Sequence, residues 1–492
     1  MSRDRLTATT LNSATCERPR YDPAQITTGI VHLGVGAFHR AHQTVYIDDC
    51  LAAGEMDWGI VGASLRSPDT RDALAPQDGL YTLAVQDASG ERLRVIGSLR
   101  QLLVAPENPA ALVARMADPS TRIITLTVTE KAYLRNAAGD LDLSNPDVAS
   151  DIVDLSNPRT VHGFIVSALA ERRRSGTPSF TVLCCDNLPA NGETVRRLVL
   201  QFAEAVDPGL ARFIEQEVAF PSTMVDRIVP ATTEEDRVRI SAAIGLDDAW
   251  PVKTEPFMQW VVEDRFTIGR PAWEQAGVTM VKDVRPFEDM KLRLLNGAHS
   301  GLSYLGLLCG RESVSAAFTD PAIRGFVDRL WAEAIPTLPE GAGLDPQTYT
   351  AALSDRFSNP ALVHRTAQIA NDGSQKLPQR ILATASARLD EGGSVSHLML
   401  AAAAWIACCE ARGNSLPAGH FTDPLDSDLD AIFAGGPSAA ETVRRVFASA
   451  GFDAVMGEAG KRLAEIAAGH LDVIRRNGPY AAIDMASQGA SE

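Results

Sequence analysis

Two patterns of apolar residues follow one another along the chain. From residue 29 to about 285, short β-rich apolar runs alternate with segments whose apolar residues recur every three or four positions. This alternation is typical of a parallel sheet whose strands are joined by crossover helices. The predicted strands are 30–33, 58–65, 122–129 and 179–185, and the helices between and after the last two are 161–174 and 193–206.

After residue 286 the strand-like runs disappear. The predicted elements are then all helices, at 286–308, 321–335, 375–389, 395–409, 439–450 and 457–475, with a Gly- and Pro-containing surface loop at 336–343. A chain of 492 residues is also too long for one ordinary core. We therefore predict an α/β protein with an N-terminal Rossmann-type doubly wound sheet domain, 1–285, and a C-terminal all-α domain, 286–492.

Composition excludes several classes of partner. The net charge of −16 argues against a nucleic-acid surface, because phosphate binding needs clustered Lys and Arg. No run reaches the ~18 apolar residues of a membrane span, and the N-terminal segment lacks the apolar core of a secretory signal. The seven cysteines include no CxxC pair, which suits neither a disulfide framework nor a zinc site. We expect a cytoplasmic protein that binds a small molecule and no metal. The sequence does not indicate its oligomeric state.

The predicted helix 286–308 carries the most suggestive set of polar groups. At about 100° per residue, Glu288, Lys291, Asn296 and His299 fall within roughly 140° of arc and share one face. A crowded, partly desolvated lysine loses its proton more easily, which allows acid–base work near neutral pH. On the spacing alone, a solvated polar surface is the more common alternative.

A glycine-containing turn follows the first predicted strand. Gly34 and Gly36 stand where the chain passes into a probable helix, so the backbone can turn tightly and approach a pyrophosphate at the helix N-terminus. His39 takes the place of the third glycine, so the dinucleotide fingerprint is partial. A tight strand-to-helix turn of another α/β protein would look similar.

The second predicted strand is followed by Arg66 and Asp69. An acidic side chain after this strand accepts hydrogen bonds from the adenosine ribose hydroxyls and repels a 2′-phosphate, which favours NAD over NADP. A turn aspartate before a helix is the alternative for Asp69. Arg66 could instead stack on adenine or pair with a phosphate.

Polar groups also end the next two predicted strands. Thr129 and Glu130 follow one of them, and Asp186 and Asn187 follow the other. Ligands of doubly wound sheets bind outside the carboxyl ends of the strands, although ordinary loops also begin with Asp and Asn. Asn187 could donate to a carbonyl oxygen, as Asn296 could from the helical domain, and a cleft between the domains would bring them together.

Charged residues stand in two further segments. Asp226 and Arg227 lie among apolar residues, where a charge pair must be matched or must face a ligand. Structural ion pairing and substrate contact explain this pair equally well. Lys376 and Arg380 follow a Gly-containing turn at a helix start, where they could meet a hydroxyl, a carboxylate or only solvent.

Together these segments resemble one family. GVGAFHRAHQ, TVTEKAY, CDNLPANG, FPSTMVDRIVP, KLRLLNGAHS and DGSQKLPQR closely resemble the polyol-specific long-chain dehydrogenase/reductases, over about residues 28 to 390. This family includes mannitol 2-dehydrogenase, D-arabinitol dehydrogenase and fructuronate reductase (D-mannonate oxidoreductase). The resemblance implies an NAD-dependent, metal-independent hydride transfer between a secondary alcohol and a ketone of an open-chain sugar derivative.

The resemblance also implies a role for each candidate residue. Lys291 would be the general acid–base, Asn187 and Asn296 would form an oxyanion hole, His299 would orient the substrate, Glu288 would pass the proton toward solvent, and Asp226 and Lys376 would contact distal hydroxyls. The expected cofactor-binding residues are Gly34, Gly36, Phe38, His39, Arg66, Asp69, Thr129 and Glu130.

Two positions point to different substrates. Met258 stands where fructuronate reductases are expected to carry an arginine, and Gln368 stands where mannitol dehydrogenases are expected to carry one. We favour a neutral polyol such as D-mannitol, oxidised to D-fructose, because a buried uronate carboxylate without a guanidinium partner would be strongly destabilised. D-mannonate/D-fructuronate and D-arabinitol are the alternatives. A zinc-dependent polyol dehydrogenase and a non-catalytic nucleotide-binding sensor are more remote.

Overall fold

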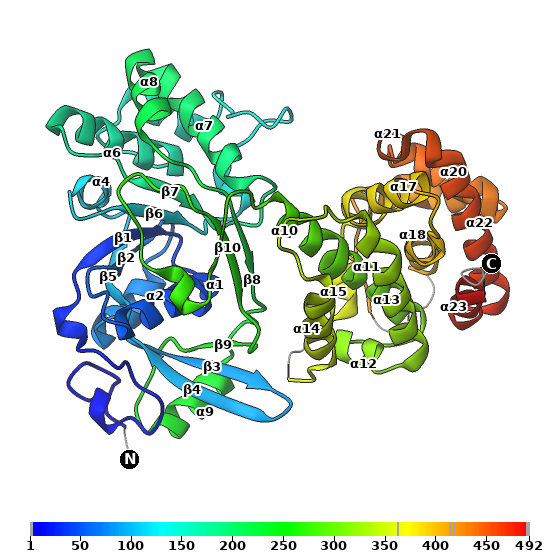
Figure 1. Ribbon diagram of the computed structural model, residues 1–492, viewed down its shortest axis with the longest axis horizontal. Helices are drawn as coiled ribbons and strands as arrows, with labels where there is room; N and C mark the ends of the chain where they lie inside the picture. The colour runs from blue at the N-terminus through cyan, green and yellow to red at the C-terminus, as the bar shows by residue number, and fades with distance from the viewer. Residues whose placement is uncertain (1–2, 362–363, 413–415, 417–418, 489–492) are drawn as a thin grey trace. The chain divides into compact units, whose positions relative to one another are not determined.

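The computed structural model describes residues 3–361, 364–412, 416 and 419–488. The chain forms two compact units, Met1–Arg285 and Pro286–Glu492. Figure 1 shows unit 1, from blue to green, with strands and helices, and unit 2, from green to red, with helices. No helix of the described residues has the length and apolar character needed to cross a membrane.

A five-stranded parallel sheet forms the centre of unit 1. Its strand order is β5-β2-β1-β6-β7, so the chain passes from β1 to one edge and then returns to build the other side. Most of its residues are apolar and buried, as expected for a sheet with helices on both faces. The strands are β1 (Thr28–Leu33), β2 (Gly59–Ser64), β5 (Leu99–Val104), β6 (Ile123–Leu126) and β7 (Thr181–Cys184).

This sheet confirms the predicted fold class and the four predicted strands. The helices over one face pack against one another and fill a core of Leu, Val, Ile and Phe with β1, β6 and β7. Their bounds are α4 (Pro109–Ala117), α6 (Val161–Ser175), α7 (Asn191–Val206) and α8 (Pro208–Glu217). The opposite face is covered by α2 (Gln43–Ala52). The strand order reverses between β1 and β6, and doubly wound sheets bind ligands at such a switch point.

Unit 1 also contains two smaller sheets that were not predicted. One has the order β4-β3-β9 and contains an antiparallel hairpin, and the other has the order β11-β10-β8, in which β8 runs antiparallel to β10. Their strands are β3 (Tyr81–Asp87), β4 (Gly90–Ile96), β9 (Val252–Thr254), β8 (Thr223–Asp226), β10 (Gln259–Glu263) and β11 (Thr279–Val281). Several have only three to five residues, which is too short for a distinct apolar period.

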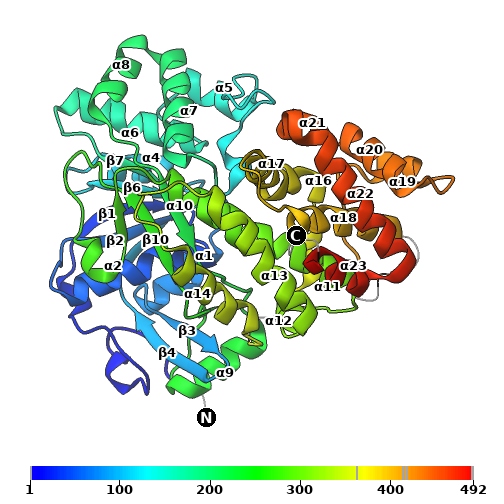
Figure 2. The ribbon, with the colours of Figure 1, turned by 45° about the vertical axis from the view of Figure 1, so that its right-hand side comes forward.

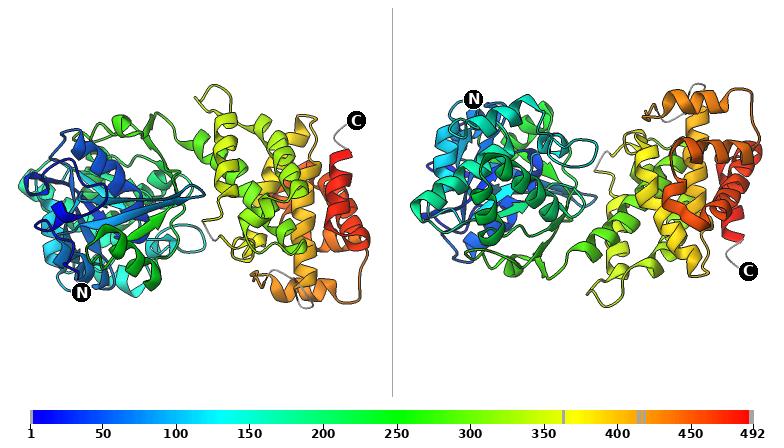
Figure 3. Two further views of the ribbon diagram at one scale, coloured as in Figure 1. Left: turned by 90° about the horizontal axis from the view of Figure 1, so that it is seen from below. Right: turned by 90° about the horizontal axis from the view of Figure 1, so that it is seen from above.

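Every element of unit 2 that the structure describes is helical. The predicted helices are found as α13 (Pro321–Ala334), α18 (Ser396–Ala411), α20 (Ala439–Ser449) and α22 (Gly460–Asn477). Helix α18 is buried on nearly all sides and packs against α11 (Gly297–Leu308) and α22 (Figure 2). Both views of Figure 3 show green and yellow helices on one side of it and red helices on the other. Six other helices of the described residues were not predicted: α12 (Val314–Phe318), α14 (Pro346–Ser358), α15 (Thr366–Ala370), α19 (Asp426–Phe433), α21 (Asp453–Met456) and α23 (Pro479–Gln488).

Two helical stretches of unit 2 contain π-helical turns. The predicted helix 286–308 consists of α10 (Arg285–Met290), the π-helical segment Lys291–Asn296 and α11. The predicted helix 375–389 consists of α16 (Gly373–Leu377), the π-helical segment Pro378–Leu382 and α17 (Ala383–Asp390). The prediction of a regular α-helix from 286 to 308 is therefore wrong in its middle. Single π-turns of this kind are frequent at functional sites.

One buried histidine of α6 makes the stability of unit 1 sensitive to acid. His162 lies between the rings of Tyr133 and Phe202, neither of its ring nitrogens has a hydrogen-bond partner, and burial lowers its pKa to about 4. The unfolded chain, with an ordinary histidine pKa of about 6.5, binds the proton more readily than the folded chain. The stability that comes from burying a neutral ring is therefore complete above pH ~6.5 and lost as the pH falls toward 4.

We expect His162→Phe to reduce the loss of unfolding free energy between pH 7 and pH 4 by up to about 3 kcal/mol, because the phenyl ring cannot take up a proton. Urea denaturation of both proteins at the two pH values measures this difference. An equal loss in wild type and variant would show that His162 is not the acid-sensitive group.

Candidate active site

The turn after β1 is built around a glycine that no other residue can replace. Gly34 has φ +96°, and a Cβ placed on it would lie 2.2 Å from the carbonyl oxygen of Thr127. Gly36 has φ −87°, caps α1 (Ala37–Ala41) and is exposed, and a Cβ on it would meet nothing closer than 3.9 Å. Gly34 thus makes the turn possible, whereas Gly36 leaves an open surface to which a pyrophosphate could come close.

Two stacked histidines support this turn from beneath. The ring nitrogens of His32 bond the hydroxyl of Thr125 at 2.8 Å, the hydroxyl of Thr127 at 2.9 Å and the carbonyl oxygen of Gly34 at 3.1 Å. The ring of His39 stacks on His32 at 3.3 Å and has no exposed surface. Burial lowers the pKa of His32 to about 3 and that of His39 well below its usual value. Any effect of His39 on a cofactor would therefore act through the turn.

The remaining expected cofactor residues of this region are accessible. The ring of Phe38 is half-buried and stacks on His42 at 5.0 Å. Arg66 and Asp69 are both exposed beyond the carboxyl end of β2, the strand beside β1. Asp69 is the first residue of α3 (Asp69–Leu74), and its carboxylate accepts a hydrogen bond from the hydroxyl of Ser67 at 2.9 Å.

The ends of β6 and β7 are joined by one carboxylate. Asp186 accepts hydrogen bonds from the backbone N–H groups of Val128 and Thr129, both at 2.9 Å, and from the hydroxyl of Tyr133 at 2.6 Å. Thr129 has φ +72°, a conformation that costs a β-branched residue about 1–3 kcal/mol. Thr129, Glu130 and the neighbouring Asn187 are exposed at this edge of the sheet, where a ligand could reach them.

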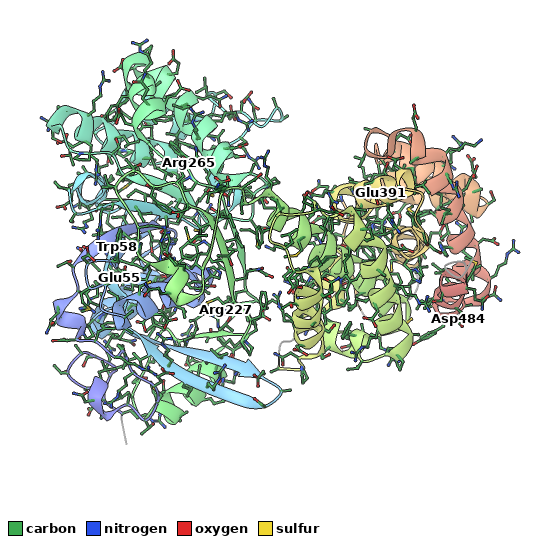
Figure 4. The ribbon with its side chains drawn as sticks, viewed as in Figure 1. Glu55, Trp58, Arg227, Arg265, Glu391 and Asp484 are labelled. Atoms are coloured by element: carbon green, nitrogen blue, oxygen red, sulfur yellow. The ribbon has the colours of Figure 1, made fainter. Side chains whose placement is uncertain are left out.

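Asp226 and Arg227 lie at the end of β8, and both are buried. The Arg227 guanidinium donates to the carbonyl oxygens of Glu255 and Ala41 and to the sulfur of Met258, which lies 3.1 Å away. Burial lowers the pKa of Arg227 to about 10. Figure 4 shows Arg227 inside unit 1. Through these bonds to backbone carbonyls, Arg227 has a structural role: it fixes the end of β8 to the backbone at Ala41 and Glu255.

In unit 2, the π-helical segment begins with Lys291 and ends with Asn296. The i→i+5 repeat of a π-helix joins these two positions across a single turn, whereas a regular α-helix would turn them about 140° apart. Glu288 precedes the segment on α10, and His299 follows it on α11. The π-turn thus brings an amine and an amide of the predicted set closer together around the helix.

The ring of His299 is held in an apolar and aromatic setting. It lies 4.7 Å from the ring of Phe357 and 5.3 Å from that of His364, and its Nε2 atom has no hydrogen-bond partner. Burial, together with the charges of His364, Arg356 and Arg380, lowers its pKa well below the usual value. The neutral ring can therefore exchange one hydrogen bond with a substrate hydroxyl at ordinary pH.

Lys376 and Arg380 lie on the second π-containing stretch, beside α11. The Lys376 amine donates to the carbonyl oxygens of Asn371 at 2.6 Å and Ile369 at 3.3 Å, and burial together with the charge of Arg380 lowers its pKa. Arg380 donates to the hydroxyl of Ser300 at 3.3 Å, and its Nε atom has no partner. Arg380 was noted beside Lys376 in the sequence but was given no role, and His364 was not predicted, because only the packing of distant helices brings these two side chains near His299.

The hydrogen bonds of Asp186 were also not predicted, although Asp186 itself was a candidate site residue because it follows a strand.

The described residues contain no group of three or more His, Cys, Asp or Glu side chains arranged to hold a metal ion. All seven cysteines are thiols outside disulfides.

Comparisons with known proteins match both units. Residues 28–275 match the mannitol dehydrogenase Rossmann domain, and residues 283–459 match the mannitol dehydrogenase C-terminal domain. D-mannonate oxidoreductase of Escherichia coli (strain K12) is 44% identical over 84% of this chain and 87% of its own length. Mannitol 2-dehydrogenase of Pyrenophora tritici-repentis is 41% identical over 87% of this chain and 77% of its own length.

Two solved structures are similar over almost the whole chain. A D-sorbitol dehydrogenase in substrate-free form has a TM-score of 0.91 at 35% identity, covering 97% of this chain and 100% of its own. Pseudomonas fluorescens mannitol 2-dehydrogenase, in a ternary complex with NAD and D-mannitol, has a TM-score of 0.81 at 36% identity, covering 98% of this chain and 99% of its own.

Proposed function

This chain belongs to the mannitol dehydrogenase family and is an NAD-dependent oxidoreductase, and from that premise we propose that it interconverts D-mannitol and D-fructose with Lys291 as general acid–base. The observation that carries the proposal is the π-helical turn that joins Lys291 to Asn296, one helical step before a neutral buried His299. An amine can take the proton of a secondary alcohol, while a nearby amide and imidazole can hydrogen-bond its oxygen and orient it.

The residues of unit 1 fit the cofactor. The exposed Gly36 leaves space against which a pyrophosphate can lie, and the exposed Asp69 carboxylate suits the ribose hydroxyls. Bound NAD would supply the hydride acceptor at the nicotinamide ring. Thr129 and Glu130, at the carboxyl end of β6, would line its pocket.

The other steps would belong to side chains of this protein. During oxidation the Lys291 amine would accept the hydroxyl proton as the carbon loses its hydride, and Glu288 would pass the proton on to solvent. Asn187 and Asn296 would donate to the oxygen as negative charge develops on it, a contribution typically worth several kcal/mol at the transition state. His299 would orient the substrate through Nε2, and Asp226 and Lys376 would hold its distal hydroxyls.

The contacts of Met258 support a neutral substrate. A methionine occupies the position where an arginine would serve a uronate, and its sulfur receives a hydrogen bond from Arg227, whose other donors bond backbone carbonyls. A substrate carboxylate at this position would find the Arg227 guanidinium already bonded to backbone carbonyls, and without an arginine at position 258 it would be poorly compensated when desolvated.

A sugar-acid substrate is the second candidate, favoured by a different observation. The charge of Arg380 acts on His299, Lys376 lies near Arg380, and the Nε atom of Arg380 has no hydrogen-bond partner. The 44% identity to a D-mannonate oxidoreductase points the same way. The interconversion of D-mannonate and D-fructuronate would use the same acid–base groups.

A substrate panel decides between these candidates. The purified protein is incubated with NADH and, separately, with fructose, fructuronate, xylulose or tagaturonate, while the absorbance of NADH is followed. The higher kcat/KM for fructose than for fructuronate supports the neutral polyol, and the reverse order selects the sugar acid. Absence of turnover with all four would reject both, and activity that persists with a chelator present would exclude a zinc mechanism.

Cofactor preference gives a separate prediction for Asp69. Asp69→Ala should raise the ratio of kcat/KM for NADP to that for NAD by about tenfold, the equivalent of removing ~1.4 kcal/mol of repulsion toward the 2′-phosphate. Asp72→Ala is the matched control, because Asp72 is also an exposed acid in the first turn of α3 but is paired with Arg71 at 2.7 Å. If both variants change the ratio equally, overall charge rather than Asp69 sets the preference.

A further inference from the structure

Asp186 follows β7, and its side chain holds the segment after the neighbouring strand β6 in an unusual conformation. One carboxylate oxygen accepts the N–H of Thr129, and the other accepts the N–H of Val128 and the hydroxyl of Tyr133. Thr129 is β-branched and has φ +72°, which its own side chain disfavours. Strained conformations of this kind persist only where surrounding contacts over-determine them, and these three hydrogen bonds provide that restraint.

The backbone of Asp186 restrains the opposite side of the same edge. Its carbonyl oxygen accepts the N–H of Leu188 at 2.9 Å, which closes a three-residue turn around Asn187, and also accepts the Asn191 amide at 3.1 Å. The same Asn191 side chain exchanges two hydrogen bonds with the backbone of Thr223, both at 2.9 Å. Asn187 is therefore the exposed middle of a turn that is fixed to β7 and β8.

Asp186 thus restrains both segments of unit 1 that the proposed reaction needs at this edge of the sheet, Thr129–Glu130 and Asn187. Its side chain sets the path of Thr129 and Glu130, and its carbonyl sets the path of Asn187. Both carboxylate oxygens are already engaged by protein donors, so the group is suited to support and not to contact with substrate.

We propose that Asp186 is a positioning residue that fixes the Asn187 amide and the Thr129–Glu130 backbone in the geometry required for hydride transfer. This inference rests on the proposed function of Asn187 as a donor to the substrate oxygen. A carboxylate is required because it accepts from two backbone N–H groups at once. An amide in its place has one acceptor oxygen and turns an NH₂ group toward the second N–H.

Asp186→Asn is therefore expected to lower kcat by about 10- to 100-fold, the range that small misplacements of reacting groups produce. The KM for the sugar should change little, because the distal contacts of Asp226 and Lys376 stay in place. The dissociation constant of NADH, from quenching of protein fluorescence, should rise, because Thr129 and Glu130 lose their fixed path.

Asp151→Asn is the matched control. Asp151 is a fully buried aspartate that, like Asp186, accepts backbone N–H bonds from two successive residues, here Arg159 and Thr160, and a hydroxyl bond, here from Thr160. Both variants should lower the melting temperature, but Asp151→Asn should leave kcat within about twofold of wild type, because distant stability defects do not alter site geometry. Equal kcat in Asp186→Asn and wild type, or an equal fall in both variants, overturns the proposal.

Hydrogen exchange keeps the test independent of the substrate. The amides of residues 128 and 129 should exchange faster in Asp186→Asn than in wild type and in Asp151→Asn. If wild type turns over no sugar, the proposed function fails, whereas exchange and NADH affinity still decide the positioning role. Unchanged exchange and affinity overturn it.

Two more variants cover the remaining outcomes. Glycine adopts a positive φ without strain, so Thr129→Gly added to Asp186→Asn should restore part of the lost NADH affinity, and no restoration overturns the proposed restraint on Thr129. If Asp186→Asn does not fold, Asp186→Glu takes its place, since it keeps both acceptor oxygens one methylene further out. A folded Asp186→Glu protein with lowered kcat supports the proposal, and one with wild-type kcat overturns it.

Discussion

Replacing Lys291 by alanine should lower kcat by about 10²- to 10⁴-fold while NADH binding is retained. The amine is proposed to accept the proton of the substrate hydroxyl, and neither alanine nor a nearby amide can do so. NADH affinity should persist because the residues expected to bind the cofactor, from Gly34 to Glu130, belong to unit 1, whereas Lys291 belongs to unit 2. Steady-state kinetics and fluorescence titration with NADH measure the two quantities.

Lys461→Ala is the control for removing a lysine from the same unit, because Lys461 is exposed at the start of α22. It should leave kcat unchanged. A small primary amine added to Lys291→Ala should restore part of the activity by taking the place of the missing base. If Lys291→Ala turns over substrate at the wild-type rate, acid–base catalysis belongs to another group, and if wild type catalyses nothing while binding NADH, a sensor role becomes the better account.

Gly34→Ala should raise the dissociation constant of NADH by about 100-fold, equivalent to ~2.7 kcal/mol, and lower the melting temperature. The Cβ atom would lie 2.2 Å from the Thr127 carbonyl oxygen, and alanine is strained at φ +96°. Because the obstacle is the backbone of Thr127, just after β6, relief requires the turn or this segment to move. Fluorescence titration and thermal denaturation measure both effects.

Gly36→Ala separates cofactor contact from damage to the fold. At φ −87° and with no atom closer than 3.9 Å, the added methyl group fits the protein without cofactor, so the melting temperature should stay the same. NADH affinity should nevertheless fall, because the methyl group occupies the surface to which the pyrophosphate is expected to come close. Wild-type affinity in both glycine variants would place the cofactor elsewhere.

Much of the fold could be predicted from local sequence patterns. Strands β1, β2, β6 and β7 are continuous apolar runs because both faces of the parallel sheet are covered, and such runs stand out in the sequence. Long helices such as α6 and α18 gave clear signals through their length and apolar content. The confirmed family followed from short motifs, since glycines, amides and lysines at fixed spacing reflect chemical requirements.

Strands β3, β4, β5 and β8 to β11 were not predicted, because such strands acquire their structure from pairing with distant segments. The regular helix assumed over residues 286–308 was wrong for a similar reason. A π-turn loosens the regular hydrogen-bond ladder, and here Trp331 donates to the Leu294 carbonyl oxygen within it at 2.9 Å. The closeness of Gly297 to the Arg380 carbonyl oxygen shows the second π-containing stretch packed against the first.

The sequence alone therefore determined the fold class, the family and the chemical groups available for catalysis, because residue type and local periodicity carry that information. Tertiary structure decided which of those groups lie close together and which contacts hold them in place. Asp186 and Thr129 are 57 positions apart in the chain, and their hydrogen bond exists only because β6 and β7 pair. Lys291 and Asn296 would be about 140° apart on a regular α-helix, and a π-turn against which other helices pack brings them closer together around the helix. Contacts between distant residues leave no local periodicity to read.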